Sequence, residues 1–273
     1  MKKNRYKNKT EKVVKPNIFL KPVLIILLLC LANFILIYVY DFTMQSRYFT
    51  IKKIKIIGNN RVVSKEIMGL AKIKKTDNLL SINLNLLEKR IANHPWVKDA
   101  LVKRNLPSTL LININEEIPL ALVKIDNIAE IIINHNGTPF KEYNPEIDKV
   151  DNLPVITGLV LTKYDNDYLF KGQLLNSVLK VLTINEFGKI YSIKADKNMG
   201  ISILTFDQEN QVLMKLGFNN FKNKALKAKQ IKNYFKNHMA NKEICTFDLY
   251  DPENVFVKSK DKDALHNLTK GGA

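Results

Sequence analysis

The longest apolar run in the chain covers residues 22–40, PVLIILLLCLANFILIYVY, and contains no charged side chain. At about 1.5 Å per residue, a helix of this length spans roughly 28 Å, close to the thickness of a bilayer's hydrocarbon core. Lipid offers the backbone no hydrogen-bond partners, so the run predicts a transmembrane helix. A cleaved signal peptide is the alternative, but its apolar region is shorter and ends at a small-x-small site, which the following DFTMQSRYF lacks.

Beyond a polar connector predicted at 41–48, the period of the apolar positions switches between two and 3.6 residues. The predicted elements are a strand at 53–56, helices at 64–71 and 83–92, and strands at 96–104 and 110–114. His94-Pro95 should end the second helix, because a residue before proline avoids the helical region. The order β-α-α-β-β predicts a small two-layer domain over 49–124 that buries Trp96, its largest apolar group.

After Pro119 the pattern predicts a second domain, of mixed β type, over 125–258. Asn136-Gly137 is a strong hairpin signal. The remaining predicted elements are helices at 171–187 and 221–237, strands at 190–195, 200–206, 212–216 and 245–250, a turn at 251–254 and a strand at 255–257. The fold class is therefore α+β: one transmembrane helix, a β-α-α-β-β domain and a C-terminal mixed β domain with flanking helices, followed by a flexible tail at 259–273.

The second predicted helix of this domain, at 221–237, is basic and amphipathic. Its expected core anchors are Phe221, Leu226, Ile231 and Phe235. Its lysines are expected to form a solvated face; they are Lys222, Lys224, Lys227, Lys229, Lys232 and Lys236.

Charge sets the expected orientation of the membrane helix. Residues 1–21 carry eight Lys or Arg and one Glu, a net +7 of the chain's +17. The positive-inside rule then places this basic tail in the cytoplasm and the residues after 40 on the other side. The tail lysines can also contact anionic lipid headgroups. The remaining basic excess is scattered among many Asn and Ile, which does not predict a nucleic-acid partner.

Candidate catalytic and metal-ligating residues are few. The histidines, His94, His135, His238 and His266, lack the spacing of a metal site, and no cofactor-binding glycine loop is present. Ser177 and Lys180 match the S-x-x-K nucleophile motif, but without the downstream S-x-N and K-T-G partners, so both are expected on the exposed side of a helix. Cys245 begins an apolar strand, where thiols are unreactive. The sequence predicts no enzyme, catalytic residue, metal or cofactor.

Several segments resemble one known family. Residues 49–123 resemble a POTRA domain, most closely in HPWVKDALVKRNLPSTL, and the whole arrangement resembles the bacterial cell-division protein family FtsQ, called DivIB in Gram-positive species. Further along, IIINHNGTPF, LPVITG, VLMKLG and TFDLYDPENVFVK resemble the family's hairpin, LP-x-x-G, Leu-Gly and V-D-L-R segments. Tyr250 stands where the family usually carries Arg.

The resemblance implies a non-enzymatic division scaffold that binds the single-span partners FtsB and FtsL and links early division proteins to septal peptidoglycan synthesis. It also implies a single-pass type II protein of the inner, or cytoplasmic, membrane at the division septum, with the C-terminal domain periplasmic or otherwise extracytoplasmic. Other divisome proteins would bind the POTRA domain and the transmembrane helix. The alternatives are a membrane-anchored sensor or assembly factor that binds proteins through its POTRA domain, or an anchored envelope enzyme.

The last strand falls near the end of the predicted domain, so it is expected to lie at a sheet edge that can accept a partner's strand. The predicted partner-binding residues are Tyr250, Val255, Phe256 and Val257. Replacing Val255 by Pro is expected to remove a backbone donor and weaken binding.

Overall fold

The structure, a computed structural model, describes residues 20–126, 129–165, 167–207, 210–239, 242–251 and 253–261. The predicted basic tail lies almost wholly outside these residues, as do Pro252 and most of the predicted C-terminal tail. The described chain belongs to two compact units, which are treated separately below. The first comprises Met1–Gly58, Ser64–Ile91 and Ala100–Ile114, and the second comprises Asn59–Val63, Ala92–Asp99 and Asn115–Ala273.

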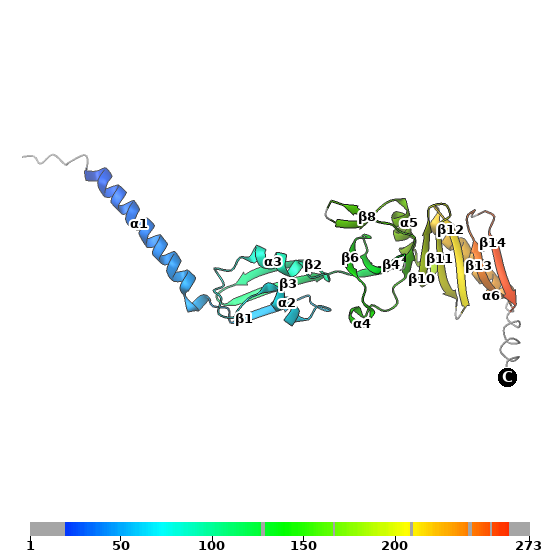
Figure 1. Cartoon of the computed structure of the whole chain (residues 1–273), viewed down its shortest axis with the longest axis horizontal. Helices are drawn as coiled ribbons and strands as arrows, with labels where there is room; N and C mark the ends of the chain where they lie inside the picture. The colour runs from blue at the N-terminus through cyan, green and yellow to red at the C-terminus, as the bar shows by residue number, and fades with distance from the viewer. Residues whose placement is uncertain are drawn as a thin grey trace, which may run out of the picture. The chain divides into compact units, whose positions relative to one another are not determined.

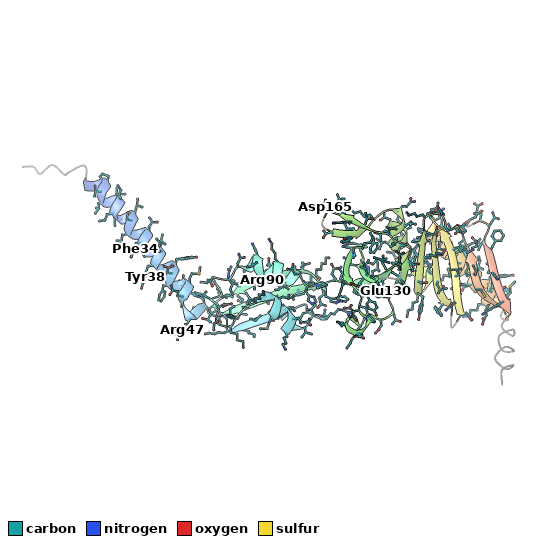
Figure 2. All side chains as sticks on the ribbon, viewed as in Figure 1. Phe34, Tyr38, Arg47, Arg90, Glu130 and Asp165 are labelled. Atoms are coloured by element: carbon teal, nitrogen blue, oxygen red, sulfur yellow. The ribbon has the colours of Figure 1, made fainter. Side chains whose placement is uncertain are left out.

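The described part of the first unit begins with helix α1 (Leu20–Gln45; Figure 1), whose apolar side chains are exposed and project from the helix (Figure 2). Phe34 is 70% exposed and Tyr38 is 67% exposed, a degree of apolar exposure that only a lipid environment makes favourable. Among the described residues, α1 is the one helix long and apolar enough to cross a membrane. This supports single-pass anchoring.

Helix α1 continues through most of the connector predicted at 41–48 and ends at Gln45, and a 3₁₀ turn, η1 (Arg47–Phe49), follows at once. The five added residues contain neither Pro nor Gly, so nothing in them stops the helix. Ser46 provides the break: its backbone is extended, and its Oγ accepts a hydrogen bond from the Tyr48 amide at 3.2 Å.

The rest of the first unit follows the predicted β-α-α-β-β order. Its elements are β1 (Lys53–Ile57), α2 (Ser64–Ala71), α3 (Leu84–Ala92), β2 (Val97–Asn105) and β3 (Thr109–Glu116). The sheet has the order β1-β3-β2, with β1 parallel to β3. Ile67 of α2, Ile91 of α3 and Leu110 of β3 are buried completely, which confirms a two-layer domain with the helices packed on the sheet.

The second unit is built on a nine-stranded sheet of order β14-β13-β12-β11-β10-β7-β4-β5-β6 (Figure 1). Its strands are β4 (Pro119–Ile125), β5 (Ala129–Asn134), β6 (Pro139–Glu142), β7 (Val155–Thr157), β10 (Ile190–Asp196), β11 (Gly200–Asp207), β12 (Asn210–Gly217), β13 (Lys242–Asp248) and β14 (Phe256–Asp261). The hairpin predicted at Asn136-Gly137 is confirmed, since β5 and β6 pair antiparallel. The last strand was predicted to end at Val257, but it reaches Asp261 because Ser259 and Lys260 continue the pairing with β13.

Helices cover one face of this sheet. They are α5 (Gln173–Leu182), the 3₁₀ turn η2 (Asn185–Phe187) and α6 (Phe221–His238); the smaller pieces α4 (Pro145–Asp148), β8 (Leu161–Tyr164) and β9 (Asp167–Phe170) complete the unit. Val178 of α5 and Ala225 of α6 share one buried cluster with Ile203 of β11.

The buried face of α6 differs from the prediction. It consists of Phe221, Lys224, Ala225 and Ala228. Leu226, a predicted anchor, is exposed, and Lys224, predicted to be solvated, is 1% exposed. The four buried residues have the spacing i, i+3, i+4, i+7, so they lie on one face of the helix. This spacing places Lys224 on the same face as Phe221. Leu226, five residues after Phe221, lies outside that face.

Within the second unit, the carboxylate of Asp148 is the centre of a cluster of hydrogen bonds. Its Oδ2 lies 2.7 Å from the Lys141 Nζ and accepts a hydrogen bond from the Asn144 amide at 2.8 Å. Its Oδ1 accepts one from the Trp96 Nε1 at 3.2 Å. The guanidinium of Arg61 stacks 4.4 Å above the Trp96 ring and donates to the Asp148 carbonyl oxygen at 2.6 Å. Trp96 is therefore buried, as predicted, and its indole N–H has a partner.

Candidate protein-binding surface

The hairpin formed by β13 and β14 ends the nine-stranded sheet, with β14 as its outermost strand. The two strands pair antiparallel from Lys242 opposite Asp261 to Asp248 opposite Phe256, with a bulge between Ile244 and Thr246. One side of β14 therefore has no neighbouring strand within the described sheet. Such an edge presents backbone N–H and C=O groups to which another strand can pair.

The other edge of the sheet is much less suited to strand addition. It is β6, which has four residues and begins with Pro139. A short edge strand that contains proline is a common protection against unwanted pairing, because proline lacks the N–H donor. The six residues of β14 include no proline. Of the two edges, β14 offers the longer and more regular template.

The four predicted partner-binding residues divide between two surfaces. Phe256 is 73% exposed and Tyr250 is 37% exposed. Val255 and Val257, in contrast, are half-buried and pack against the core of the unit. The division follows from the alternation of a strand, since Phe256 pairs with Asp248 and Val257 with the buried Phe247. Val255 also lies before the first residue of β14, so replacing Val255 by proline is a poor test of strand pairing at β14.

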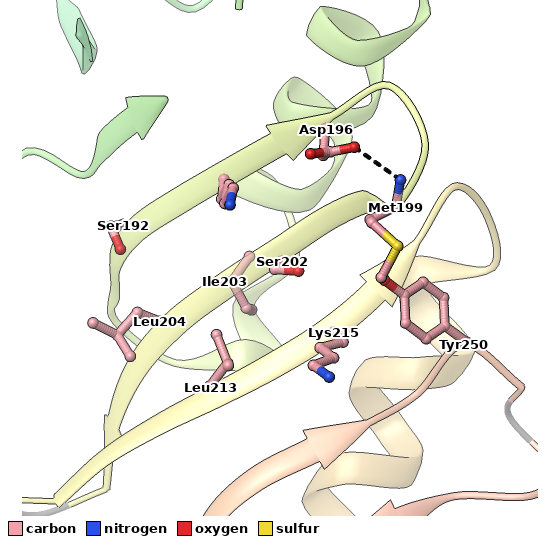
Figure 3. A pocket seen from close by; sticks show the side chains of 10 residues that line it. Ser192, Asp196, Met199, Ser202, Ile203, Leu204, Leu213, Lys215 and Tyr250 are labelled. Carbon is pink, nitrogen blue, oxygen red and sulfur yellow. Dashed lines mark hydrogen bonds between the residues drawn. The ribbon is translucent and has the colours of Figure 1, made fainter. Parts of the chain in front are cut away.

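Tyr250 borders a shallow cavity of about 270 Å³ on the face of the sheet opposite the helices (Figure 3). Alternate residues of three strands line it, including Ser202 and Leu204 of β11 and Leu213 of β12. Lys215 lies beside Tyr250 in the cavity, and its Nζ is 3.8 Å from the Asp248 carboxylate. The surface combines exposed apolar groups with one partly exposed ion pair, a composition typical of protein-binding sites.

The environment of Tyr250 keeps its hydroxyl protonated. Burial raises the pKa of the Tyr250 phenol, and the nearby carboxylates of Asp248 and Asp196 raise it further. Asp196 is itself held as an anion, because hydrogen bonds from the Asn198 and Met199 amides lower the pKa of its carboxyl (Figure 3). The Tyr250 hydroxyl can therefore donate a hydrogen bond at any physiological pH.

Lys224 supports the turn that carries Tyr250, a role not anticipated from the sequence. Its Nζ donates to the Leu216 carbonyl oxygen at 2.7 Å. Burial lowers the pKa of the Lys224 ammonium, and the Asp251 carboxylate partly offsets this effect. Gly217, the residue after Leu216, has a φ of +68°. A Cβ added to this glycine would lie 3.0 Å from the Tyr250 ring. The glycine thus allows the ring to approach the backbone closely.

Other candidate residues are not brought together. No group of three or more His, Cys, Asp or Glu among the described residues could hold a metal ion, and His266 lies outside them. Cys245 is half-buried at the bulge of β13. The expectation that Ser177 lies on the exposed side of its helix is wrong: it is 5% exposed, whereas Lys180 is exposed.

Comparison with known proteins agrees with this description. Residues 49–117 match the family model described as "POTRA domain, FtsQ-type". The chain is 29% identical over 173 residues to "Cell division protein FtsQ" of Syntrophotalea carbinolica, covering 59% of this chain and 57% of that protein. It is 28% identical to FtsQ of Myxococcus fulvus, covering 52% and 48%. It is 24% identical to "Cell division protein DivIB" of Clostridium tetani, covering 62% and 61%.

An apolar helix, a β-α-α-β-β domain and a β-rich domain with an open edge define a membrane-anchored POTRA protein. Its residues 49–117 form an FtsQ-type POTRA domain, and much of the chain is similar to the cell division proteins FtsQ and DivIB. The matched segments span about half the length of the first two relatives.

Proposed function

We propose that this protein is a non-enzymatic divisome scaffold that binds FtsB- and FtsL-like proteins and connects early division proteins to septal peptidoglycan synthesis. The observation that carries the proposal is the open edge of β14, six residues long, next to the exposed side chains of Phe256 and Tyr250. In this proposal the partner adds a strand to β14, so that backbone hydrogen bonds supply affinity and side-chain contacts supply specificity.

The side chains of β14 indicate what kind of strand would fit. Phe256, Lys258 and Lys260 alternate along the strand and are exposed. Lysines on an edge strand oppose indiscriminate pairing, because burying an unpaired ammonium is unfavourable. A partner strand with carboxylates opposite Lys258 and Lys260 and an apolar residue near Phe256 would satisfy all three. The edge would thus be open to one class of partner and closed to copies of itself.

The proposal extends to location. The protein is a single-pass type II protein of the cytoplasmic (inner) membrane at the division septum, with the N-terminal tail in the cytoplasm and both folded domains outside. The charge asymmetry around α1 supports this orientation. Other divisome proteins bind the POTRA domain and α1.

Two neighbouring proline variants test strand addition to β14. Successive residues of an edge strand direct their N–H groups alternately toward the neighbouring strand and away from it. Of Lys258→Pro and Ser259→Pro, one therefore removes a hydrogen bond to β13 and the other removes only an outward donor. We expect the outward variant to keep the circular dichroism spectrum of the unmodified chain and to weaken binding of the FtsB-like outer segment by at least about tenfold.

The paired design provides its own control. The inward variant should lose hairpin protection in hydrogen exchange, which identifies it without knowledge of the binding result. Undiminished binding by the outward, well-folded variant would refute strand addition at β14. Failure of the unmodified full chain to bind either FtsB- or FtsL-like segments would refute the proposed function itself.

A further inference from the structure

The end of helix α1 is hydrogen-bonded to a loop of the first unit. This segment, residues 72–82 between α2 and α3, is called the α2–α3 loop below. The Asn78 Nδ2 donates to the carbonyl oxygens of Thr43 and Ser46, at 3.2 Å each. The last carbonyls of a helix have no partners within the helix. The loop therefore supplies partners for the end of α1.

The same loop is fixed to the folded domain. Its Leu79 is fully buried, and the Leu79 amide donates to the Phe49 carbonyl oxygen at 2.8 Å. From β2, Arg104 donates to the carbonyl oxygens of Leu79 at 2.8 Å and of Ile82 at 2.6 Å. Because hydrogen bonds hold the loop from both sides, it stays close to the end of the membrane helix.

This attachment fixes the loop at the level of the lipid headgroups. The uncharged, apolar run of α1 ends at Tyr40, and Asp41 follows. Thr43 and Ser46 lie about 5 and 9 Å further along the helix axis, at about 1.5 Å per residue. The headgroup layer on each side of the hydrocarbon core is roughly 5–8 Å thick. Tyr48, which is 63% exposed, suits this level because aromatic side chains concentrate there.

The exposed side chains of the α2–α3 loop are mainly basic. Lys72, Lys74 and Lys75 are exposed, and Arg47 is exposed just after α1 (Figure 2). Asp77 is the one acidic residue of the loop, and its carboxylate accepts a hydrogen bond from the Lys74 amide at 2.9 Å. The Asp77 amide donates back to the Lys74 carbonyl oxygen at 3.1 Å, which closes a tight turn. This turn joins the lysines directly to the attached part of the loop.

We infer that the α2–α3 loop is a membrane contact, in which Lys72, Lys74, Lys75 and Arg47 bind anionic lipid headgroups of the bilayer that α1 spans. Two independent observations support a lipid partner. The loop is hydrogen-bonded to the part of α1 that leaves the hydrocarbon core, and its exposed charges are mainly positive. Lysines next to a membrane helix bind anionic surfaces in this way.

The contact depends on no partner at β14 and holds for either orientation of α1. The four cations, set against Asp41 and Asp77, leave a net charge of +2 (4 − 2) on these segments. The attraction is therefore favourable and sensitive to salt, which screens exposed charges.

Spin-label accessibility of the full chain in lipid nanodiscs tests the contact. The label is placed at Thr76→Cys, an exposed position of the loop, in a chain whose Cys30 and Cys245 are replaced by Ser. Discs of phosphatidylcholine alone are compared with discs that contain phosphatidylglycerol. We expect collisions with an uncharged, water-soluble nickel chelate to be at least about twofold rarer in the phosphatidylglycerol discs, and added salt to remove the difference.

Charge variants separate the loop from the net charge of the chain. Replacing Lys72, Lys74 and Lys75 together by Gln should abolish the dependence on phosphatidylglycerol. The matched control replaces three exposed lysines of α6 by Gln and should leave the dependence unchanged; they are Lys227, Lys229 and Lys236. Because the discs contain no other protein, this pattern identifies lipid as the partner.

Asn78→Ala tests the attachment to α1. We expect the label to become more accessible in both kinds of disc, with an unchanged circular dichroism spectrum, whereas Asn85→Ala at an exposed position of α3 should have no effect. Equal accessibility in the two kinds of disc, or the same loss of lipid dependence in the α6 control, would overturn the membrane contact. Unchanged accessibility in Asn78→Ala would overturn the role of Asn78 in positioning the loop.

Discussion

At the scale of single residues, Asp148 illustrates how hydrogen bonds can keep a buried carboxyl group ionised. Burial by itself raises the pKa of the Asp148 carboxyl, but hydrogen bonds from Lys141, Asn144 and Trp96 outweigh it and hold the pKa below the ordinary 3.8. Since the folded pKa is lowered, the ionised carboxylate stabilises the fold above pH 3.8. That stabilisation is lost as the pH falls through the folded value.

Replacing Asp148 by Asn should therefore destabilise the protein in a pH-dependent way. At pH 7 we expect the free energy of unfolding to fall by about 3 kcal/mol, because Lys141 loses its buried partner. The difference should shrink as the pH falls below 3.8, where the carboxyl of the unfolded chain takes up a proton, and should vanish once the folded carboxyl is neutral as well. Trp96 is the only tryptophan of the chain, so urea unfolding followed by its fluorescence measures the effect at the site.

Asp151→Asn is the matched control, because it changes an exposed aspartate three residues away. A loss of stability in Asp148→Asn that stayed constant from pH 7 to pH 3 would contradict the electrostatic explanation.

At the scale of elements, two glycines fix the ends of parallel strand pairs. Gly58 follows β1 and Gly158 follows β7, with φ of +86° and +85°. A Cβ at Gly58 would collide with the Ile114 carbonyl oxygen of β3, and one at Gly158 with the Ala195 carbonyl oxygen of β10. Each glycine lets the chain leave its strand while pressed against the neighbouring strand.

We expect Gly158→Ala to lower the free energy of unfolding by more than Gly188→Ala. Both positions have positive φ, which costs an alanine roughly 1 kcal/mol, but nothing lies within 4 Å of a Cβ at Gly188. Chemical denaturation of the two variants isolates the cost of the collision with Ala195. Equal losses would show that the backbone angle alone matters and that the strands separate easily.

Elements with long regular patterns were predictable, and short ones were not. The helices and strands of residues 53–116 follow from periodicity, because each shows at least one full repeat of its pattern. β7 has only Val155–Thr157, too short to display a period, and its neighbours β4 and β10 are distant in sequence.

The candidate surface was predictable only in part. The last strand suggested an edge, and β14 occupies one, but which side chains face outward depended on the register with β13. The charge of Lys224 predicts a solvated side chain, but its i+3 spacing from Phe221 places it on the buried face of α6.

At the scale of the whole molecule, α1 determines where the folded units can work. Its 26 residues make a helix of about 39 Å, longer than the roughly 30 Å of bilayer hydrocarbon, so its final turns extend beyond the lipid core. Asp41 and the polar end of α1 suit this interfacial position. The first folded strand, β1, begins at Lys53, eight residues after the helix ends.

Thiol labelling of intact cells tests the orientation of α1. In a chain whose Cys30 and Cys245 are replaced by Ser, we expect Ser46→Cys to react with a membrane-impermeant maleimide from outside. Lys9→Cys should react only after the membrane is permeabilised. The reason is that basic flanks of a membrane helix stay in the cytoplasm, as the positive-inside rule states. Labelling of Lys9→Cys in sealed cells, with Ser46→Cys protected, would reverse the proposed topology.

The short strand β7 has a consequence for how the nine-stranded sheet comes into being. It joins two antiparallel sets, β4-β5-β6 and β10-β11-β12, through parallel pairings of three residues on each side. Neighbours within each set are close in sequence, so each set closes small loops, whereas β7 must find partners more than 30 residues away in both directions. Local contacts form fastest. The parallel pairing of β12 with β13 spans a similar distance in sequence. We therefore expect the two sets to form early and independently, and the sheet that carries β14 to become continuous only in later, slower steps, when β7 is inserted and β13 pairs with β12.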